Sequence, residues 1–218
     1  MSAAQAAETL RAALGEDGAA KLDGLLAQVA ADPAAIHRLF PAAARRVGRG
    51  PLPGTDARVE DEVRAALLAA HADAVPTDRL ADDVAELYRL GDADEKRAVL
   101  LALDRLPLGA EAVPLLADAL RTNDTRLVAA ALGPYATRHY DTESWRQGVL
   151  KCLFVGVPLA AVDALPERAD ARLGEMVAAY ANERLAAGRD VPADAAALLA
   201  DFPDQVSAAG LTGRLPTP

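Results

Sequence analysis

The sequence predicts an all-α protein, built as an irregular array of helices. The chain is 52% hydrophobic but only 4% aromatic, so much of its apolar content is alanine, the best helix former. Prolines and acidic capping residues divide it into segments whose apolar residues recur at helical spacing. No segment shows sustained strand alternation. We expect roughly eight to eleven helices that hold about two thirds of the residues or more, well above the ordinary one third.

Residues 1–54 are expected to form an N-terminal helical lobe. Its first helical stretch is interrupted between Gly15 and Gly18. Asp32 is the expected N-cap of the next helix, because Pro33 follows it at the first helical position. That helix runs into Pro41, which should kink or stop it. The helices expected before Asp32 cover 4–14 and 19–31.

The lobe ends in the most loop-like stretch of the chain, Gly48 to Asp56. Positions 48–54 hold five glycine or proline residues. They do not form a phosphate-binding loop, since neither a GxxxxGK[ST] pattern nor a preceding strand accompanies them. We interpret this stretch as a mobile linker.

Residues 55–203 form the expected core, and 204–218 a flexible tail. Asp92 and Glu95 have the spacing of a capping box after the stop signal at Gly91. A similar helix pair follows about 32 residues later, which favours HEAT-like stacked pairs, although an irregular bundle fits almost as well. The helices expected in the core cover 57–72, 78–90, 94–105, 110–121, 125–132, 142–156 and 170–187, with Asp141 as a cap and a further short helix after Pro192.

Charge and composition exclude several classes of function. The net charge of −9 and the pI near 4.8 argue against binding of nucleic acid or of an anionic membrane surface, which need clustered basic residues.

The N-terminus lacks the pattern of a secretory signal. The longest uncharged apolar stretch, from Cys152 to Val162, is too short to span a bilayer, which takes about twenty residues. With Cys152 as the single cysteine, no internal disulfide is possible. We expect a cytoplasmic protein.

Lys151 lies in a nearly continuous apolar helix, where an unpartnered ammonium would be costly. Glu183 falls close to the apolar stripe of the 170–187 helix, so a buried pair of Lys151 with Glu183 is the leading interpretation. Snorkelling of the lysine to solvent is the second interpretation. The third is a lysine with a depressed pKa that acts in catalysis or binds an anion.

An aromatic cluster precedes and begins the same helix. Aromatic side chains with a polar tip commonly line ligand clefts and interfaces, but they also fill junctions between helices. Both interpretations stay open. We expect Trp145 to be buried as an anchor and His139 or Tyr140 to be exposed. The cluster comprises Tyr135, His139, Tyr140, Asp141 and Trp145.

Other reactive side chains favour structural roles. No metal site is expected, because His37, His71 and His139 have none of the usual ligand spacings. Cys152 lies among apolar neighbours, where a thiol behaves as a small hydrophobe. The acidic runs 60–62 and 82–83 are expected on solvated helix surfaces, where they complement helix dipoles.

Two segments, 145–159 and 182–189, resemble the EboA domain family. They read WRQGVLKCLFVGVPL and NERLAAGR. The resemblance covers roughly residues 85–200 and is poor over 1–75. The family typically has asparagine where this chain has Arg146, and methionine near Gly148. The positions that correspond to the family pattern are Gln147, Lys151, Phe154, Arg168, Glu183, Arg184 and Arg189.

The resemblance implies an uncharacterised helical protein. Genes of this family tend to lie beside genes for a prenyltransferase-like membrane protein and for isomerase-like, hydrolase-like and dehydroquinate synthase-like enzymes. This implies a non-catalytic scaffold or small-molecule carrier that handles or exports a secondary-metabolite precursor, without a cofactor, and whose partners are pathway enzymes or a metabolite. The alternative is an enzyme that uses Lys151 with Glu183. The residues expected to bind are Tyr135, His139, Tyr140, Trp145, Gln147, Arg168 and Arg184.

Overall fold

The computed structural model describes residues 3–216, with side chains from residue 8 onward. It is 74% helical, and the described residues form thirteen α-helices and no strand. This confirms the all-α prediction. The number of helices exceeds the expected eight to eleven, because three helices of four to six residues form where the sequence indicated turns, bridges or tail.

The chain divides into two compact units, Met1–Ala119 and Leu120–Pro218. The division falls within helix α6 (Val113–Arg121) and not in the 48–54 loop, where we expected the first boundary. HEAT-like stacking of helix pairs stays a prediction.

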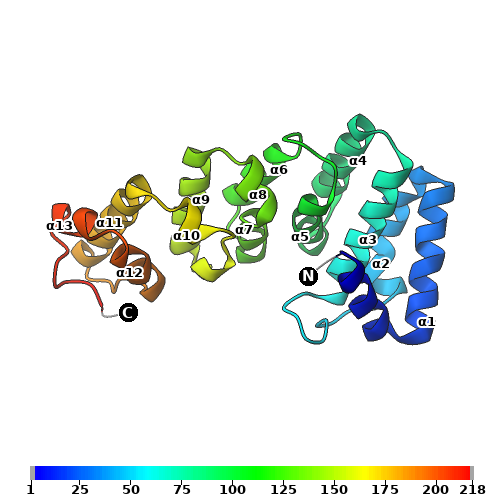
Figure 1. The fold of residues 1–218 in the computed structure, drawn as a ribbon, viewed down its shortest axis with the longest axis horizontal. Helices are drawn as coiled ribbons and strands as arrows, with labels where there is room; N and C mark the ends of the chain where they lie inside the picture. Colours follow the sequence, from blue (N-terminus) through cyan, green and yellow to red (C-terminus); the bar gives the residue numbers. More distant parts are fainter. Residues whose placement is uncertain (1–2, 217–218) are drawn as a thin grey trace. The chain divides into compact units, whose positions relative to one another are not determined.

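In the first unit, α3 is the central helix. It contacts α1, α2, α4 and α5, which are gathered around it in Figure 1. Its apolar residues Val63, Leu67 and Leu68 are fully buried. The helices of this unit before α6 are α1 (Ala3–Ala31), α2 (Ile36–Arg46), α3 (Val59–Ala74), α4 (Thr77–Leu90) and α5 (Ala93–Ala102), with 3-10 turns η1 (Pro33–Ala35) and η2 (Leu103–Arg105).

The expected start and stop signals of the first unit mostly hold. Gly15 takes a left-handed backbone, with φ of 67°, and breaks the run of α1. Asp32 accepts a hydrogen bond from the N–H of Ala34. Pro41 does not end α2, which continues to Arg46 and only forgoes one helical hydrogen bond. The capping box of α5 is present in both directions, between Asp92 and Glu95.

The loop before α3 is anchored, which is not the behaviour expected of a mobile linker. Leu52 is 1% exposed, and its N–H donates to the carbonyl of Ala57 at 2.8 Å. The Oε2 atom of Glu60 accepts a hydrogen bond from the N–H of Gly50 at 2.9 Å. A buried carboxylate at the start of α3 therefore fastens the glycine-rich loop to the helix that follows.

The second unit has an apolar core made mainly by α7, α9, α11 and α12. Trp145, Val149 and Cys152 of α9 and Val177 of α11 are fully buried within it. Asp141 caps α9 as expected, accepting from the N–H of Ser144 at 2.9 Å. The helices of this unit are α7 (Thr125–Ala131), α8 (Pro134–His139), α9 (Thr142–Val155), α10 (Leu165–Arg168), α11 (Ala171–Ala186), α12 (Ala193–Ala200) and α13 (Pro203–Ala208), with the 3-10 turn η3 (Leu159–Ala161).

The segment expected as a flexible tail is partly structured. It contains α13, and Leu211 beyond this helix is fully buried in the core of the second unit. Apolar side chains after Pro203 thus contribute to packing, which the expectation for 204–218 missed. The first two residues of the expected lobe and the last two of the expected tail lie outside the described residues. Within residues 3–216, no helix has the length and apolar content needed to cross a membrane.

Candidate functional site

The aromatic cluster of the second unit is mostly packed inside. Trp145 is fully buried and Tyr135 is 3% exposed, whereas His139 and Tyr140 are half-buried. The rings of Tyr135 and His139 lie 4.7 Å apart. The prediction that Trp145 is buried is confirmed. The rings of His139 and Tyr140 reach solvent only in part, so they offer little free aromatic area.

Arg168, one of the residues expected to bind, packs against this cluster. Its guanidinium lies 4.5 Å from the Trp145 ring and donates to the carbonyls of Ala136 and Tyr140 at 2.9 and 3.0 Å. These carbonyls belong to the end of α8, where a cation is favoured. Burial holds the pKa of Arg168 below its usual value. The side chain therefore fixes α8 against α9.

Lys151 and Glu183 have different environments from those expected. The Nζ atom of half-buried Lys151 donates to Oδ1 of Asn123 at 2.7 Å. Glu183 is exposed, so the expectation that it lies near the core is wrong. Gly174, Ala178 and Ala181 also belong to the buried side of α11. The side of the helix that faces the core is therefore centred on these residues, and Glu183 lies outside it.

Among the side chains of this unit that the structure describes, Phe154 is the large apolar one that is mainly exposed, at 60%. Its ring meets the Tyr180 ring edge-on, with centroids 4.9 Å apart. Tyr180 is itself held, since its hydroxyl donates to the carbonyl of Leu153 at 3.1 Å. The guanidinium of Arg184 lies 5.8 Å from the Tyr180 ring. Phe154 is therefore a positioned aromatic side chain that faces solvent.

Helical spacing places two further polar residues beside Phe154. Lys151 lies three residues before it on α9, and Gln147 four residues before Lys151, which gives the three one side of the helix. Gln147 is exposed. We call the surface formed by Gln147, Lys151, Phe154 and Arg184 the α9–α11 face.

Cys152 does not belong to this face. It is fully buried, and burial raises the pKa of its thiol to about 12. Because the thiolate is the nucleophilic form, the thiol is inert in the folded protein.

The first unit holds a second cluster, which the sequence analysis missed. Glu60, Asp61 and Asp83, expected on solvated surfaces, are 4–5% exposed. That expectation is wrong because each carboxylate is paired across helices or with a loop. Arg97 of α5 donates to both oxygens of Asp61 at 3.1 Å.

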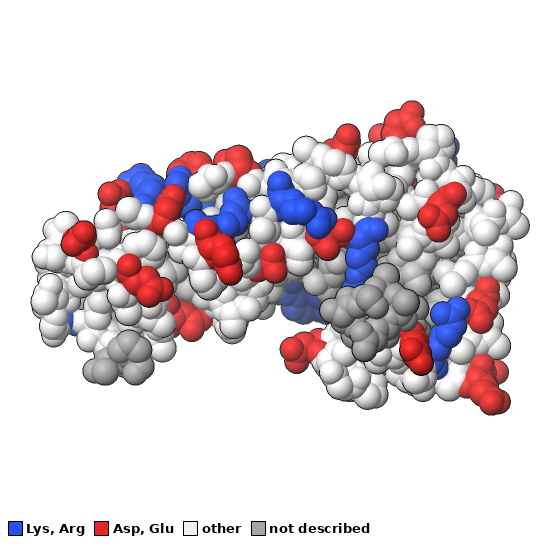
Figure 2. Space-filling model, in the orientation of Figure 1, with Lys and Arg blue, Asp and Glu red and all other residues white. Residues whose placement is uncertain are grey.

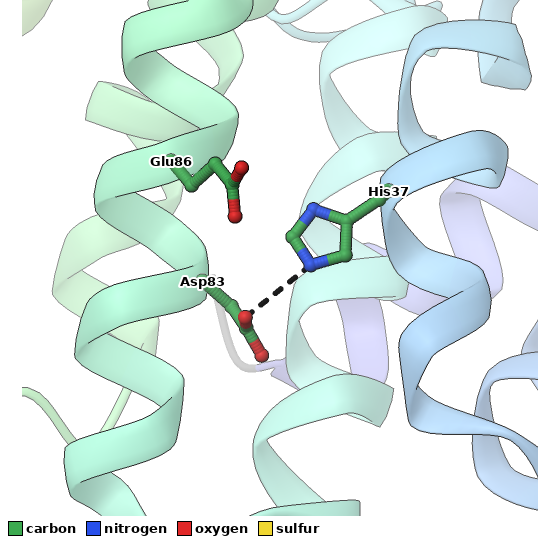
Figure 3. A group of neighbouring side chains, drawn as sticks. All are labelled: His37, Asp83 and Glu86. Atoms are coloured by element: carbon green, nitrogen blue, oxygen red, sulfur yellow. Dashed lines mark hydrogen bonds and ion pairs between the residues drawn. The ribbon is translucent and has the colours of Figure 1, made fainter.

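Asp83 is the centre of the second cluster. Its Oδ2 atom is bound by Nε2 of His71 at 2.9 Å and by Nε of Arg79 at 2.8 Å, while its Oδ1 lies 3.3 Å from Nε2 of His37. Burial alone would raise the pKa of Asp83, but the bonds from Arg79 and His71 outweigh burial and hold the pKa below its ordinary value. Glu86 completes the cluster (Figure 3). The fold therefore brings together two histidines that are far apart in sequence.

A signal for this cluster was present in the sequence. On α4, Leu80, Asp83, Val84 and Leu87 follow the spacing of one buried helix side, and all are buried. An acidic residue at such a position has to find a partner. The partners His37 and His71 lie on other helices. The sequence pattern therefore identifies the buried carboxylate but not the residues that surround it.

Surface charges of both signs are interspersed on the face shown in Figure 2, over each of the two units. Neither unit presents a large patch of one sign on that face. Any ligand site there depends on a few placed side chains and not on a broad electrostatic field.

Comparison with known proteins assigns the chain to a family. Residues 40–199, well over half of the chain, match the sequence model of a family described as metabolite traffic protein EboA. The match begins earlier than the resemblance suggested, so it includes α3, α4 and the second cluster apart from His37. No curated protein and no solved structure matches the chain. The chain belongs to the EboA family.

Proposed function

We propose that this protein is a non-catalytic helical carrier in metabolite traffic and that the α9–α11 face binds the carried molecule. The description of the family supports a role in metabolite traffic. The observation that carries the proposal is Phe154, a large ring that the fold holds against Tyr180 and leaves 60% exposed. Exposed and positioned aromatic area is typical of a binding surface.

The chemistry of the face suggests the kind of molecule. Phe154 offers an apolar contact, and the cations of Lys151 and Arg184 lie on the same two helices. A metabolite with an apolar body and a polar or anionic end would use both features. As an alternative, a pathway enzyme could dock on the same face, which would make the protein a scaffold.

A catalytic role for this unit has less support. Lys151 is bonded to Asn123, and Glu183 is exposed on α11. The Cys152 thiol is buried, with its pKa raised to about 12. These are the side chains that an enzyme using Lys151 with Glu183, or a thiol, would need in one accessible place. The acidic composition and single cysteine favour action in the cytoplasm, in keeping with a role in secondary metabolism.

The test is mass spectrometry of small molecules that copurify with the protein from its native host. Three forms are compared: the unmodified chain, Phe154→Ala, and Leu101→Ala as a matched control. Leu101 is also a large exposed apolar residue, 46% exposed, but it lies on α5 of the first unit. Both substitutions should leave the helix content and melting temperature nearly unchanged.

We expect one compound to be enriched with the unmodified chain and with Leu101→Ala, and to fall at least about tenfold with Phe154→Ala, the factor that 1.4 kcal/mol of lost binding produces. Equal amounts with all three forms would contradict the site. No compound with any form, together with a photo-crosslink from position 154 to a pathway enzyme, would replace the carrier with the scaffold.

A further inference from the structure

The second cluster has the composition of a metal site. One nitrogen of His37 and one carboxylate oxygen each of Asp83 and Glu86 all lie within 4.8 Å of one another. His37 comes from α2, and the two acids stand about one turn apart on α4, with both carboxylates turned towards the imidazole (Figure 3). Three ligands from two helices thus meet at one point.

The contact between His37 and Asp83 is longer than a short ion pair and leaves space for a shared cation. Nε2 of His37 is 3.3 Å from Oδ1 of Asp83. A charge-assisted hydrogen bond between these groups would be shorter, about 2.7–2.9 Å. Two ligands at about 2.1 Å from a tetrahedral metal ion are separated by about 3.4 Å. The spacing of His37 and Asp83 is therefore already that of two ligands on one ion.

Asp83 is fixed by groups that would not bind the ion themselves. Oδ2 of Asp83 accepts hydrogen bonds from Nε2 of fully buried His71 and from Nε of Arg79. These bonds orient the carboxylate and leave Oδ1 directed towards His37. Ligating carboxylates in metalloproteins are commonly held in this way by a second layer of hydrogen bonds.

Two of the three side chains in this group are accessible to solvent. The side chains of His37 and Glu86 are 32% and 46% exposed, whereas that of Asp83 is 6% exposed. An ion can reach the ligands from solvent, and Glu86, which also forms a 3.9 Å ion pair with Arg89, is exposed enough to turn towards the ion. Three protein ligands, of which Asp83 is buried and His37 and Glu86 are accessible, leave at least one coordination position for water or another bound molecule. Some zinc sites keep an open position in this way.

We propose that His37, Asp83 and Glu86 bind one divalent transition-metal ion of the zinc class, with solvent completing its coordination. The imidazole nitrogen favours Zn²⁺ or Co²⁺ over Mn²⁺, Ca²⁺ and Mg²⁺, which prefer oxygen ligands. The ion would tie α2 to α4 and present an open coordination position to an oxygen donor. This site lies in the first unit and is independent of the α9–α11 face.

The test is metal titration of the untagged, chelator-treated full chain. Zn²⁺ binding is followed by calorimetry, and Co²⁺ binding by its visible absorption. The test variants are His37→Gln and Glu86→Gln, which change accessible side chains and spare the hydrogen bonds that Asp83 accepts from His71 and Arg79. The matched controls are His139→Gln in the second unit and Asp82→Asn, an exposed acid beside Asp83 on the same helix.

We expect one ion per chain for the unmodified protein and for both controls, with at least tenfold weaker binding for each test variant. The visible band of Co²⁺ should shift in His37→Gln, because an imidazole ligand is lost. Bound Zn²⁺ should raise the melting temperature of the unmodified chain but not of the test variants. No stoichiometric binding by the unmodified chain, or equal binding by both test variants, would overturn the site.

Discussion

The two units of this protein position their helices by different means. Among the described side chains, the buried polar and charged residues Glu60, Asp61, Arg64, His71 and Asp83 all lie in the first unit, four of them on α3. The core of the second unit is apolar, and its ion pairs, such as Arg146 with Asp170, lie near the surface. Buried charged pairs therefore orient α3, whereas α9 and α11 are oriented mainly by apolar packing.

The difference predicts different sensitivities to mutation. A buried ion pair adds little net stability over an apolar pair, but removal of one partner leaves a charge that the interior cannot solvate. An apolar core responds instead to added or lost volume.

The largest effect is expected from Arg97→Met, which leaves Asp61 buried without its bidentate partner. We expect a loss of about 3–5 kcal/mol in the free energy of unfolding, measured in urea at neutral pH. The matched control is Arg105→Met. Arg105 also binds a carboxylate of α3 through two nitrogens, at 2.6 and 2.9 Å from Glu62, but its side chain is 45% exposed. Because the Glu62 side chain is 12% exposed, against 6% for Asp61, this change should cost less than Arg97→Met, about 1–2 kcal/mol.

The pH dependence of Arg97→Met sharpens this test. Burial raises the pKa of Asp61 above its ordinary value even beside Arg97. Without Arg97 the folded pKa rises further above the unfolded one, so the folded state takes up a proton as the pH falls. The deficit of Arg97→Met should therefore shrink towards acid pH. Equal deficits for Arg97→Met and Arg105→Met at neutral pH would refute the contrast between buried and exposed pairs.

A smaller effect is expected from Gly174→Ala on α11. A Cβ atom at this position would lie 2.7 Å from Cγ of Phe202, closer than real contacts allow. We expect the crowding, about 1–3 kcal/mol, to exceed the gain in helix propensity, about 1 kcal/mol. The double variant Gly174→Ala with Phe202→Leu should recover part of the loss in a urea titration.

The control for this prediction lies in the first unit. Gly24 is exposed on α1, and a Cβ atom added there would meet nothing within 4 Å. Gly24→Ala should therefore stabilise the protein by about 0.5–1 kcal/mol, through helix propensity alone. If Gly174→Ala also stabilises the protein, the close approach of the Phe202 ring to α11 does not limit the stability of the second unit.

Local signals predicted the helices well. Asp32, Asp92 and Asp141 each cap a helix as expected, and Gly15 breaks α1. These signals act within a few residues, so the sequence carries them directly. The continuation of α2 through Pro41 and the anchoring of the 48–54 loop depend on neighbouring elements, and the local pattern did not indicate them.

The sites were harder to predict because they depend on contacts between distant residues. His37 and Asp83 are 46 residues apart, and Lys151 and Asn123 are 28 apart. No spacing rule connects such pairs. The core-side position of Asp83 on α4 was readable, as was that of His71, which repeats the spacing of Arg64, Leu67 and Leu68 on α3. Polar residues on apolar helix sides therefore mark Asp83 and His71 in the sequence, but they do not indicate that His37 lies beside them.

The smallest effect is expected at Asp170, which joins α9 to the start of α11. Its carboxylate binds the guanidinium of Arg146 and also accepts from the N–H of Leu173 at 3.0 Å. The hydrogen bond from Arg146 is the main reason that the pKa of Asp170 lies below its ordinary value of 3.8. Because the folded pKa is below the unfolded one, the stabilisation is complete above the unfolded value and is lost as the pH falls through the folded value.

Asp170→Asn separates the ion pair from the helix cap, since asparagine caps as well as aspartate does but carries no charge. At neutral pH, thermal unfolding of the variant should occur slightly below that of the unmodified chain, by less than either effect above. The gap should close as the pH falls through the folded pKa of Asp170, which lies below the ordinary value of aspartate, because the carboxylate of the unmodified chain is then neutral as well. It should also narrow at high salt, because the pair lies near the surface and is screened. A gap that persists unchanged in acid and in salt would show that it does not come from the charge of Asp170, and the ion pair with Arg146 would then add nothing to the packing of the second unit.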